Sequence, residues 1–512
     1  MDKAAGKTEA NRKTLTKGAS WIGSSRLIAN AIGLVSTLVL ARLLMPEDFG
    51  LVAIAESVFG LVGALTELML ANSLIQHRRP RAYHYHTAWT LNLARAALLA
   101  AMMALIGFPF ALVYGDDRFV GLFLVLAGAT LIGGLENPTL VIMWRKLIFW
   151  QDFVLNVSSK LVGFLVAVAI AYFFRSYWAL VIGALAAQAT RVAASYVIRP
   201  YRPRFSLRGH RDLLSFSVWL TLSNGIQTAN WRLDPLLLGL FVPSASVGHF
   251  SVGNRLAYLP VKEGLGPLRS LFFPAFSRMQ DDMHRLRHAY LNGQGMVALV
   301  AMPVGFGFAL IAAPMIELAL GRNWLPAVPV IQIFAAMSAI QACESVQPLA
   351  MALDRTHLVF RRDVQVFLVR IPLVLAGLAL GAASGAGALM GIVIGAAAGS
   401  LVLFVLSLRL VTALSGLSIA RQLSVAVRPL LAALVMSAGL MLVTSEPALR
   451  AALDGPLTEI AFSIGAGGIL YVAAISLFWI ASGRRDGAES AILGLAHRAW
   501  LGVRHRGRTS HP

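Results

Sequence analysis

Apolar runs of about twenty residues recur along this 512-residue chain, from Ala19 to Ile480. A helix of that length crosses the ~30 Å hydrocarbon core of a bilayer. Only 13% of the residues are charged and the mean hydropathy is +0.71, which excludes a soluble protein. Residues 1–18 are polar and basic, and no small-residue cleavage site follows them. We therefore expect no secretory signal and a first helix that stays in the membrane.

The runs predict an all-α polytopic membrane protein with about fourteen transmembrane helices. The expected spans are residues 19–43, 49–75, 88–113, 119–143, 153–174, 178–198, 212–240, 245–276, 292–320, 324–352, 358–382, 385–411, 428–445 and 458–482.

The distribution of lysine and arginine predicts the orientation of these helices. Of the 44 lysines and arginines, 30 lie in or beside the N-terminus, every second connection and the C-terminal tail, and 5 lie in the alternate connections. This bias predicts that both termini are cytoplasmic. It also accounts for the net charge of +20 without nucleic acid as a partner. The tail, 483–512, is apolar on one face and basic on the other, and is expected either to lie on an anionic inner leaflet or to end as a solvated segment.

Two stretches of the chain look alike and suggest an internal repeat. In "LARLLMPEDFGLVAIA" and "LLLGLFVPSASVGHFSVG" an apolar span is followed by a proline turn and a glycine that opens the next helix, Pro46 to Gly50 and Pro243 to Gly248. Two related six-helix lobes with the same orientation would then be related by an axis along the membrane normal. The expected domains are a cytoplasmic N-terminus (1–18), the lobes 19–211 and 212–411, two appended helices in 412–482, and the basic cytoplasmic tail.

These stretches, together with "NWRLDPLLLG", "VGHFSVGNRLAYLP" and "LFFPAFSRMQDD", resemble the Wzx-type polysaccharide flippases of the multidrug/oligosaccharidyl-lipid/polysaccharide (MOP) superfamily. The resemblance covers the first twelve expected helices. It implies a V-shaped two-lobe fold that works by alternating access around a central cavity. It also implies a polyprenyl-pyrophosphate-linked oligosaccharide as substrate, moved across a bacterial inner membrane for exopolysaccharide or lipopolysaccharide biosynthesis.

Sixteen ionisable residues fall within the expected spans when those near the span ends, such as Arg362, are counted with the adjoining connections. If each faced lipid at ~2.5–3.5 kcal/mol, the total of about 40–56 kcal/mol would exceed the ~5–15 kcal/mol stability of a folded domain. Most must therefore face a partner, a wet cavity or the interface, and Arg191, Arg269 and Arg370 near span ends are expected to snorkel. The sixteen are Arg26, Arg95, Lys160, Arg191, Arg232, Arg255, Lys262, Arg269, Arg370, Glu56, Glu67, Glu136, Asp234, Glu263, Glu317 and Glu344.

Three of these cations form a candidate binding site for an anionic headgroup. Arg255 and Lys262 are seven residues apart and so share one helical face, and Arg26 lies in the first span. Arginine offers a planar fork for phosphate oxygens and lysine a point charge. The structural alternative is internal pairing, with Glu263 nearby and with Glu56 and Glu67 of the second span as neutralising partners.

The segment "TANWRLDPLLLGLF" at 228–241 places polar groups and a proline inside an apolar run. Asn230 and Asp234 are four apart and share a face, whereas Arg232 and Asp234 are two apart and cannot pair within one regular turn. Pro235 removes a backbone donor, so a bend is expected there. We interpret the segment as cavity wall and hinge, with a satisfied structural polar cluster as the alternative.

Other chemistries find no support in the sequence. Cys343 is the only cysteine, which excludes a disulfide framework and a thiolate metal site. A metal site at His77, His84 and His86 is not expected in a basic loop. No Gly-Lys-Ser/Thr phosphate loop is present, so we expect no nucleotide hydrolysis, no cofactor and no enzymatic activity. A proton or sodium gradient is left open as the driving force.

Competing functions remain at this point. A lipid II-type flippase or an ion-coupled small-molecule exporter of the same superfamily would fit the topology, although the cationic face counts against export of cations. A polysaccharide polymerase or ligase is less favoured, because it needs a long outer loop that the chain lacks. Membrane lipids, a polysaccharide polymerase and chain-length proteins are the expected partners besides the substrate.

Overall fold

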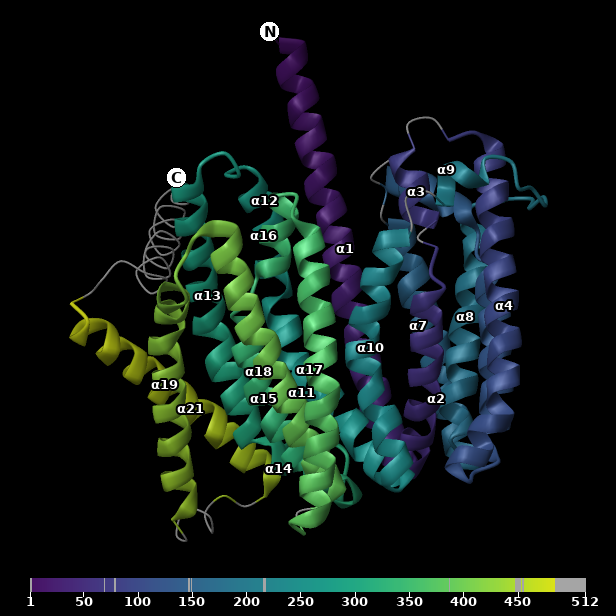
Figure 1. Ribbon diagram of the computed structural model, residues 1–512. Coiled ribbons are helices and arrows are strands. Elements are labelled where there is room, and N and C mark those ends of the chain that lie inside the picture. The colour runs from purple at the N-terminus through teal and green to yellow at the C-terminus, as the bar shows by residue number, and fades with distance from the viewer. Residues whose placement is uncertain are drawn as a thin grey trace, which may run out of the picture. The chain divides into compact units, whose positions relative to one another are not determined.

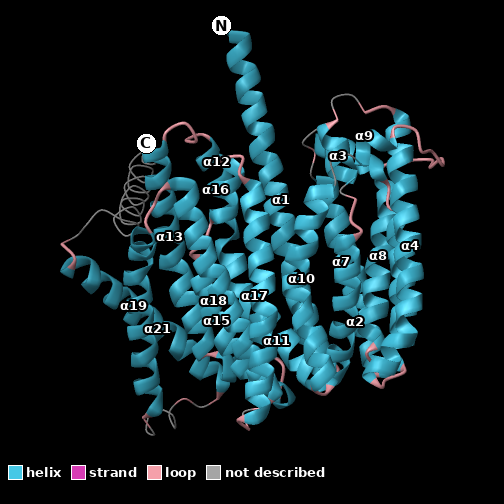
Figure 2. Ribbon diagram, in the orientation of Figure 1, coloured by secondary structure: helices cyan, strands magenta, loops and turns pink. Residues whose placement is uncertain are grey.

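The computed structural model describes residues 2–483 apart from 69, 78–79, 146–147, 149, 215–217, 386, 447–452 and 454. This part of the chain is helical throughout and contains no strand (Figures 1 and 2). The all-α prediction is therefore confirmed. The amphipathic tail expected at 483–512 lies outside the described residues, except for its first glycine.

The chain forms two compact units, Met1–Ser251 (unit 1) and Val252–Pro512 (unit 2). The division falls within one helix, some forty residues beyond the expected lobe boundary at 211–212. Unit 1 therefore includes the helix that the sequence assigned to the start of the second lobe.

Unit 1 packs its long helices in adjacent pairs, with α7 against α1 and α8, α4 against α5, and α10 against α2. The start of α2 shows why the chain turns where it does: Pro46 occupies the first helical position, and the Asp48 carboxylate accepts a 3.0 Å hydrogen bond from the Met45 N–H. The elements are α1 (Asp2–Leu43), α2 (Pro46–Leu65), α3 (Leu70–Gln76), α4 (Ala82–Tyr114), α5 (Arg118–Gly134), η1 (Pro138–Leu140), α6 (Val141–Arg145), α7 (Trp150–Phe174), α8 (Trp178–Ile198), α9 (His210–Leu214), α10 (Val218–Phe241) and the first residues of α11 (Ser244–Ser270).

Unit 2 repeats several of these pairings and adds two helices. Here α17 packs against α18, α13 against α15 and α19, and α19 against α21. Gly377 of α17 lies so close to α18 that an added Cβ would overlap the Gly391 carbonyl, which explains the glycine-rich sequence there. The elements after α11 are α12 (Phe272–Ser277), α13 (Met283–Leu310), α14 (Ala312–Ala319), η2 (Arg322–Ala327), α15 (Val328–Ala342), α16 (Val346–Ala352), α17 (Thr356–Ala383), α18 (Ala388–Ser415), α19 (Ile419–Ser445) and α21 (Pro456–Ala481).

The number of spans differs from the prediction. Within the described ranges, eleven helical segments are long and apolar enough to cross a membrane, or twelve if α5 and the segment Pro138–Arg145 (η1 and α6), which meet at 51°, form one broken span. The count of fourteen is thus not confirmed. The spans expected at 212–240 and 245–276 are α10 and α11, which at 24 and 27 residues are long enough. Their hydropathy is too low for a membrane span because polar and charged residues lie along them.

Several expected spans are also broken. The span expected at 49–75 divides into α2 and α3, and that at 245–276 into α11 and α12. The span expected at 119–143 divides into α5, η1 and α6, and that at 324–352 into η2, α15 and α16. The second and fourth spans of each half therefore break, and so does the span expected at 292–320, which divides into α13 and α14. The short pieces at the second and fourth spans pack on each other, α3 on α6 in unit 1 and α12 on α16 in unit 2. This shared pattern supports the internal repeat.

The two stretches that suggested the repeat meet within unit 1. A Cβ added at Gly50 would overlap the Ser244 carbonyl oxygen, and a Cβ added at Gly248 would overlap the carbonyl oxygen of Pro46. Both glycines are buried. The first turns of α2 and α11 therefore touch through backbone atoms at equivalent glycines.

Candidate functional site

The break between α5 and α6 in unit 1 is built around Asn137, which is 1% exposed. Its side-chain amide donates to the carbonyl oxygens of Ser195 at 3.2 Å and Arg199 at 2.8 Å. Its own N–H donates to the Ser195 hydroxyl at 3.3 Å. Backbone groups freed inside a membrane need partners. The Ser195 hydroxyl of α8 is one for the Asn137 N–H, and the Asn137 side chain in turn donates to two carbonyls at the C-terminal end of α8.

Glu136, the neighbour of Asn137, forms an ion pair with α8. The Arg191 Nε lies 3.0 Å from Glu136 Oε1, and the Arg191 Nη1 donates to Asn156 Oδ1 of α7 at 2.9 Å. Arg191 was expected to snorkel to the interface. It instead bonds within unit 1 and joins α5, α7 and α8, because the acid at the break is within reach.

The break between α2 and α3 is held by Arg95 of α4. Its Nε donates to the Thr66 carbonyl at 2.8 Å and its Nη2 to the Gly63 carbonyl at 2.9 Å. Gly63 lies in the last turn of α2 and Thr66 is its C-cap, where backbone carbonyls lack a backbone N–H partner within the helix. Glu67 follows directly and lines a cavity of about 470 Å³ that both breaks of unit 1 border.

The corresponding break in unit 2, between α15 and α16, is also held by a buried arginine. The Arg362 guanidinium of α17 donates to Glu344 Oε1 at 3.2 Å, to the Ser407 hydroxyl at 3.0 Å and to Asp363 Oδ1 at 2.8 Å. Arg362 is 7% exposed and Asp363 is 6% exposed. This buried cluster joins α15, α17 and α18 around the break.

Two more helices bond to the backbone of the same break. Arg269 of α11 donates from Nη2 to the Ala342 carbonyl at 2.8 Å. The Gln294 amide of α13, oriented so that both ends are satisfied, donates to the Cys343 carbonyl at 2.6 Å and accepts from the Ser345 hydroxyl at 2.9 Å. The expected snorkelling of Arg269 is therefore wrong, and Arg370 is likewise buried at 7% exposure against Gly399.

The α10 segment combines a buried acid with an exposed base. Asp234 is 5% exposed, whereas Arg232 is exposed and its Nε would lie 3.0 Å from a Cβ placed on Gly60 of α2. Glu56 is exposed one turn before Gly60, on the same side of α2. Asn230 is half-buried. The helix continues through Pro235 from Val218 to Phe241, and the Tyr114 hydroxyl donates to the Leu236 carbonyl at 2.8 Å, one residue after the proline.

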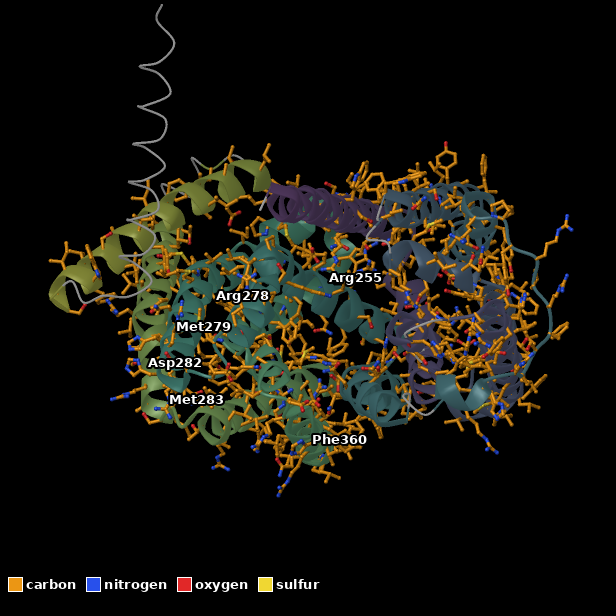
Figure 3. The ribbon with its side chains drawn as sticks, turned by 90° about the horizontal axis from the view of Figure 1, so that it is seen from above. Arg255, Arg278, Met279, Asp282, Met283 and Phe360 are labelled. Carbon is orange, nitrogen blue, oxygen red and sulfur yellow. The ribbon has the colours of Figure 1, made fainter. Side chains whose placement is uncertain are left out.

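The predicted cationic row lies on α11 in unit 2. Arg255 and Lys262 are both exposed, while Val261 and Leu265 of the same helix are buried (Figure 3 labels Arg255). Arg26 is exposed on α1 in unit 1. The proposal that these three cations line one substrate cavity with Glu56, Glu67 and the α10 residues stays a prediction.

The sequence analysis did not identify the side chains that form hydrogen bonds at the helix breaks. Arg362 was counted with a cytoplasmic connection, and Asn137 and Gln294 were not singled out. One signal was present: "LENP" and "CESVQP" each place an acid and a small polar residue shortly before a proline, in equivalent spans. An acid followed by a helix-breaking residue inside an apolar run predicts a broken span with a basic partner on a neighbouring helix.

Fold and composition together define a multi-pass helical membrane protein. The lipid II flippase MurJ in an inward closed conformation has the same fold, with a TM-score of 0.69 over 90% of this chain and 98% of that chain at 14% identity. A multidrug resistance MATE family transporter of the MOP superfamily, in an inward-facing conformation, matches with a TM-score of 0.54 over 76% of this chain and 96% of that chain at 14% identity.

Comparison at the sequence level identifies the family. The chain belongs to the polysaccharide biosynthesis protein family, whose model matches residues 39–329. It is 25% identical over 371 residues to the lipopolysaccharide biosynthesis protein WzxC of Escherichia coli (strain K12), covering 72% of this chain and 75% of WzxC. It is 25% identical over 333 residues to the succinoglycan biosynthesis transport protein ExoT of Rhizobium meliloti (strain 1021), covering 64% of this chain and 66% of ExoT. The resemblance to Wzx-type proteins is confirmed.

Proposed function

We propose that the protein is a flippase that moves polyprenyl-pyrophosphate-linked oligosaccharide units across a bacterial inner membrane by alternating access, for export of a surface polysaccharide. The observation that carries the proposal is the family match over 39–329 on a chain of eleven or more apolar helices. WzxC and ExoT, by their names, belong to lipopolysaccharide biosynthesis and succinoglycan transport. The protein acts by binding and release rather than by covalent chemistry.

The α11 row supports an anionic headgroup as part of the substrate. Arg255 and Lys262 are exposed on a helix that is too polar to face lipid along its whole length. A pyrophosphate presents oxygens to both, and the two cations lie two turns apart on one face. A lipid II-type substrate carries the same headgroup, so the sugar portion decides between the two flippase functions.

The proposal is tested by following the lipid-linked oligosaccharide in cells that lack the gene. We expect polymer at the surface to be lost and lipid-linked units to accumulate on the cytoplasmic leaflet. The Arg255→Ala/Lys262→Ala variant should restore export poorly at a normal level in the membrane. Arg278→Ala, which removes an exposed cation outside the row, is the matched control and should restore it. Unchanged surface polymer and lipid-linked units in the deletion strain would refute the function.

The proposed orientation places both termini in the cytoplasm, because 30 of the 44 basic residues gather on that side. Reporter fusions after residues 45, 116, 243 and 322 should report the outside, and fusions after 80, 205 and 283 the inside. Inverted signals at two or more positions would overturn the orientation. A polysaccharide polymerase and chain-length proteins are the proposed downstream partners, and an ion gradient is the proposed driving force.

A further inference from the structure

Unit 1 contains a cavity of about 470 Å³ that is separate from the α10 and α11 residues. It is bordered by the break between α2 and α3, by α4, by the break between α5 and α6, and by α8. Its volume is within the roughly 300–1,000 Å³ range of small-molecule sites. It adjoins α3, which lies with α9 at one end of unit 1 (Figure 1), the end that carries the basic connections expected in the cytoplasm.

The charges around this cavity balance. Two arginines, Arg95 and Arg191, and two glutamates, Glu67 and Glu136, contribute to its lining. Arg191 is paired with Glu136 at 3.0 Å, and Arg95 bonds to two backbone carbonyls of α2. Because the four charges cancel, the lining favours neither an anion nor a cation over a neutral ligand.

Fixed hydrogen-bond donors remain available after these contacts. A guanidinium carries five N–H groups, and among the described residues Arg95 and Arg191 use two each. The Asn92 side chain also belongs to the lining, and its amide donates to the Gly134 carbonyl at 3.2 Å. These groups are held in place by their existing bonds, so they are preorganised to bind hydroxyls.

Two indole rings complete the lining, Trp89 of α4 and Trp144 of α6. Trp89 is buried and held by a 3.1 Å hydrogen bond from Nε1 to the Tyr196 hydroxyl. Trp144 is half-buried. The electron-rich face of an indole attracts the C–H groups of a sugar ring, while the ring hydroxyls need donors and acceptors around the edge.

We propose that this cavity binds a neutral sugar residue and serves as an accessory subsite for the oligosaccharide of the substrate, an inference that rests on the proposed flippase function. A hydrocarbon chain fits less well, because it would leave the free guanidinium donors without partners in a partly dry site. A pyrophosphate fits less well because the lining has no net positive charge. The sugar would be engaged at the side of the membrane where the lipid-linked unit is made.

The test uses the fact that Cys343 is the only cysteine in the chain. In the full-length Cys343→Ser protein, Ala71→Cys places a thiol on the lining at a half-buried position. We expect one or more of glucose, galactose, N-acetylglucosamine and maltose, at about 0.1 M, to slow maleimide labelling by roughly 3-fold or more, whereas pyrophosphate leaves the rate unchanged. Ser384→Cys, exposed in unit 2, is the matched control and should label at the same rate with and without sugar.

Substitution of Trp144 tests whether its indole ring binds the sugar. Trp144→Leu should raise the sugar concentration needed for protection by about 3- to 10-fold, the share of one aromatic contact, and Trp144→Phe should keep most of the protection. Equal loss in both variants would indicate a packing role for the indole and refute its role in binding.

The sugar-site proposal and the flippase proposal can be refuted separately, because maleimide labelling requires no transport. Protection by pyrophosphate alone, or by none of the four sugars, would overturn the sugar site while export assays still stood. Unchanged lipid-linked units in the deletion strain would overturn the flippase function, and sugar protection would then identify a sugar site without a transport role.

Discussion

The contact between the first turns of α2 and α11 should not tolerate a single added methyl group. In Gly50→Ala, the new Cβ would overlap the Ser244 carbonyl oxygen and lie 2.6 Å from the Ser244 carbonyl carbon and 2.8 Å from the Gly248 nitrogen. All three are backbone atoms, so no side chain can rotate away. Since ordinary contact begins at 3.4 Å, the two helix starts must part by about 1 Å or more.

Overpacking of this kind costs about 1–3 kcal/mol, and at most about 1 kcal/mol is returned by the higher helix propensity of alanine. We therefore expect a net loss of about 1–2 kcal/mol. For a unit of this size the unfolding temperature should fall by about 2–8 °C. The measurement is thermal unfolding of the purified protein in one detergent, followed by loss of the monodisperse species.

Gly63→Ala on the same helix is the matched control. A Cβ at Gly63 meets nothing within 4 Å, and the Gly63 carbonyl that accepts from Arg95 is unchanged. This variant should be as stable as the natural protein or slightly more stable. An unfolding temperature for Gly50→Ala at or above that of Gly63→Ala would refute the close backbone contact.

Three further predictions concern charged groups. Asp234→Asn, which keeps shape and removes the charge of a residue that is 5% exposed, should slow export and leave lipid-linked units in the inner leaflet, whereas Asp234→Glu should keep partial activity; normal export by the Asn variant would limit Asp234 to shape and hydrogen bonding. Glu344→Gln should destabilise unit 2 by about 1–3 kcal/mol, since Arg362 loses one of its two charged acceptors, and an unchanged unfolding temperature would contradict this. Burial raises the pKa of Asp116, but hydrogen bonds and charge from Arg118 outweigh burial and hold it below its ordinary value. The stability from this pair is present above about pH 4 and is lost as pH falls through the lowered pKa, so the acid-induced fall in unfolding temperature should be shallower in Asp116→Asn.

Much of the fold could be predicted from the sequence, because hydropathy acts on whole helices. The long helices α4, α7, α8, α17, α18 and α21 lie close to their expected ranges. The stretches Pro46–Gly50 and Pro243–Gly248, which suggested the internal repeat, are brought into contact at their glycines by the structure, while the two-lobe repeat itself stays a prediction. A backbone approach this close requires glycine on both sides, and this explains why a glycine occurs in each stretch.

The breaks within spans could not be predicted from hydropathy. Residues around Asn137 and Ser345 lie between apolar half-helices, and the average over twenty residues stays high across the interruption. What stabilises each break is a partner on a helix far away in sequence, such as Arg191 for Glu136 and Arg362 for Glu344. For the same reason Arg269 looked like an interfacial residue, although its guanidinium bonds to a carbonyl of the next break.

The predicted substrate-binding residues could be foreseen only in part. Arg255, Lys262, Arg232 and Glu56 are exposed, as cavity residues would be, and Asp234 is buried within unit 1. Helical periodicity could predict which of them share a face. It could not predict which face looks onto substrate, because that depends on packing between helices rather than on any one of them.

The broken span of α5 and α6 also constrains the order in which the chain can assemble. Glu136 is synthesised 55 residues before its partner Arg191, and Asn137 58 residues before Ser195. At ~5–20 residues per second, this delay is roughly 3–11 s. During that time the polar groups of the break would be stranded in lipid, where each costs several kcal/mol. The equivalent break in unit 2 follows Arg269 and Gln294, so two of its partners are already made. We therefore expect the nascent first unit to stay in a wet or protein-lined site until α8 emerges, and we expect truncation before α8 to impair insertion of this span.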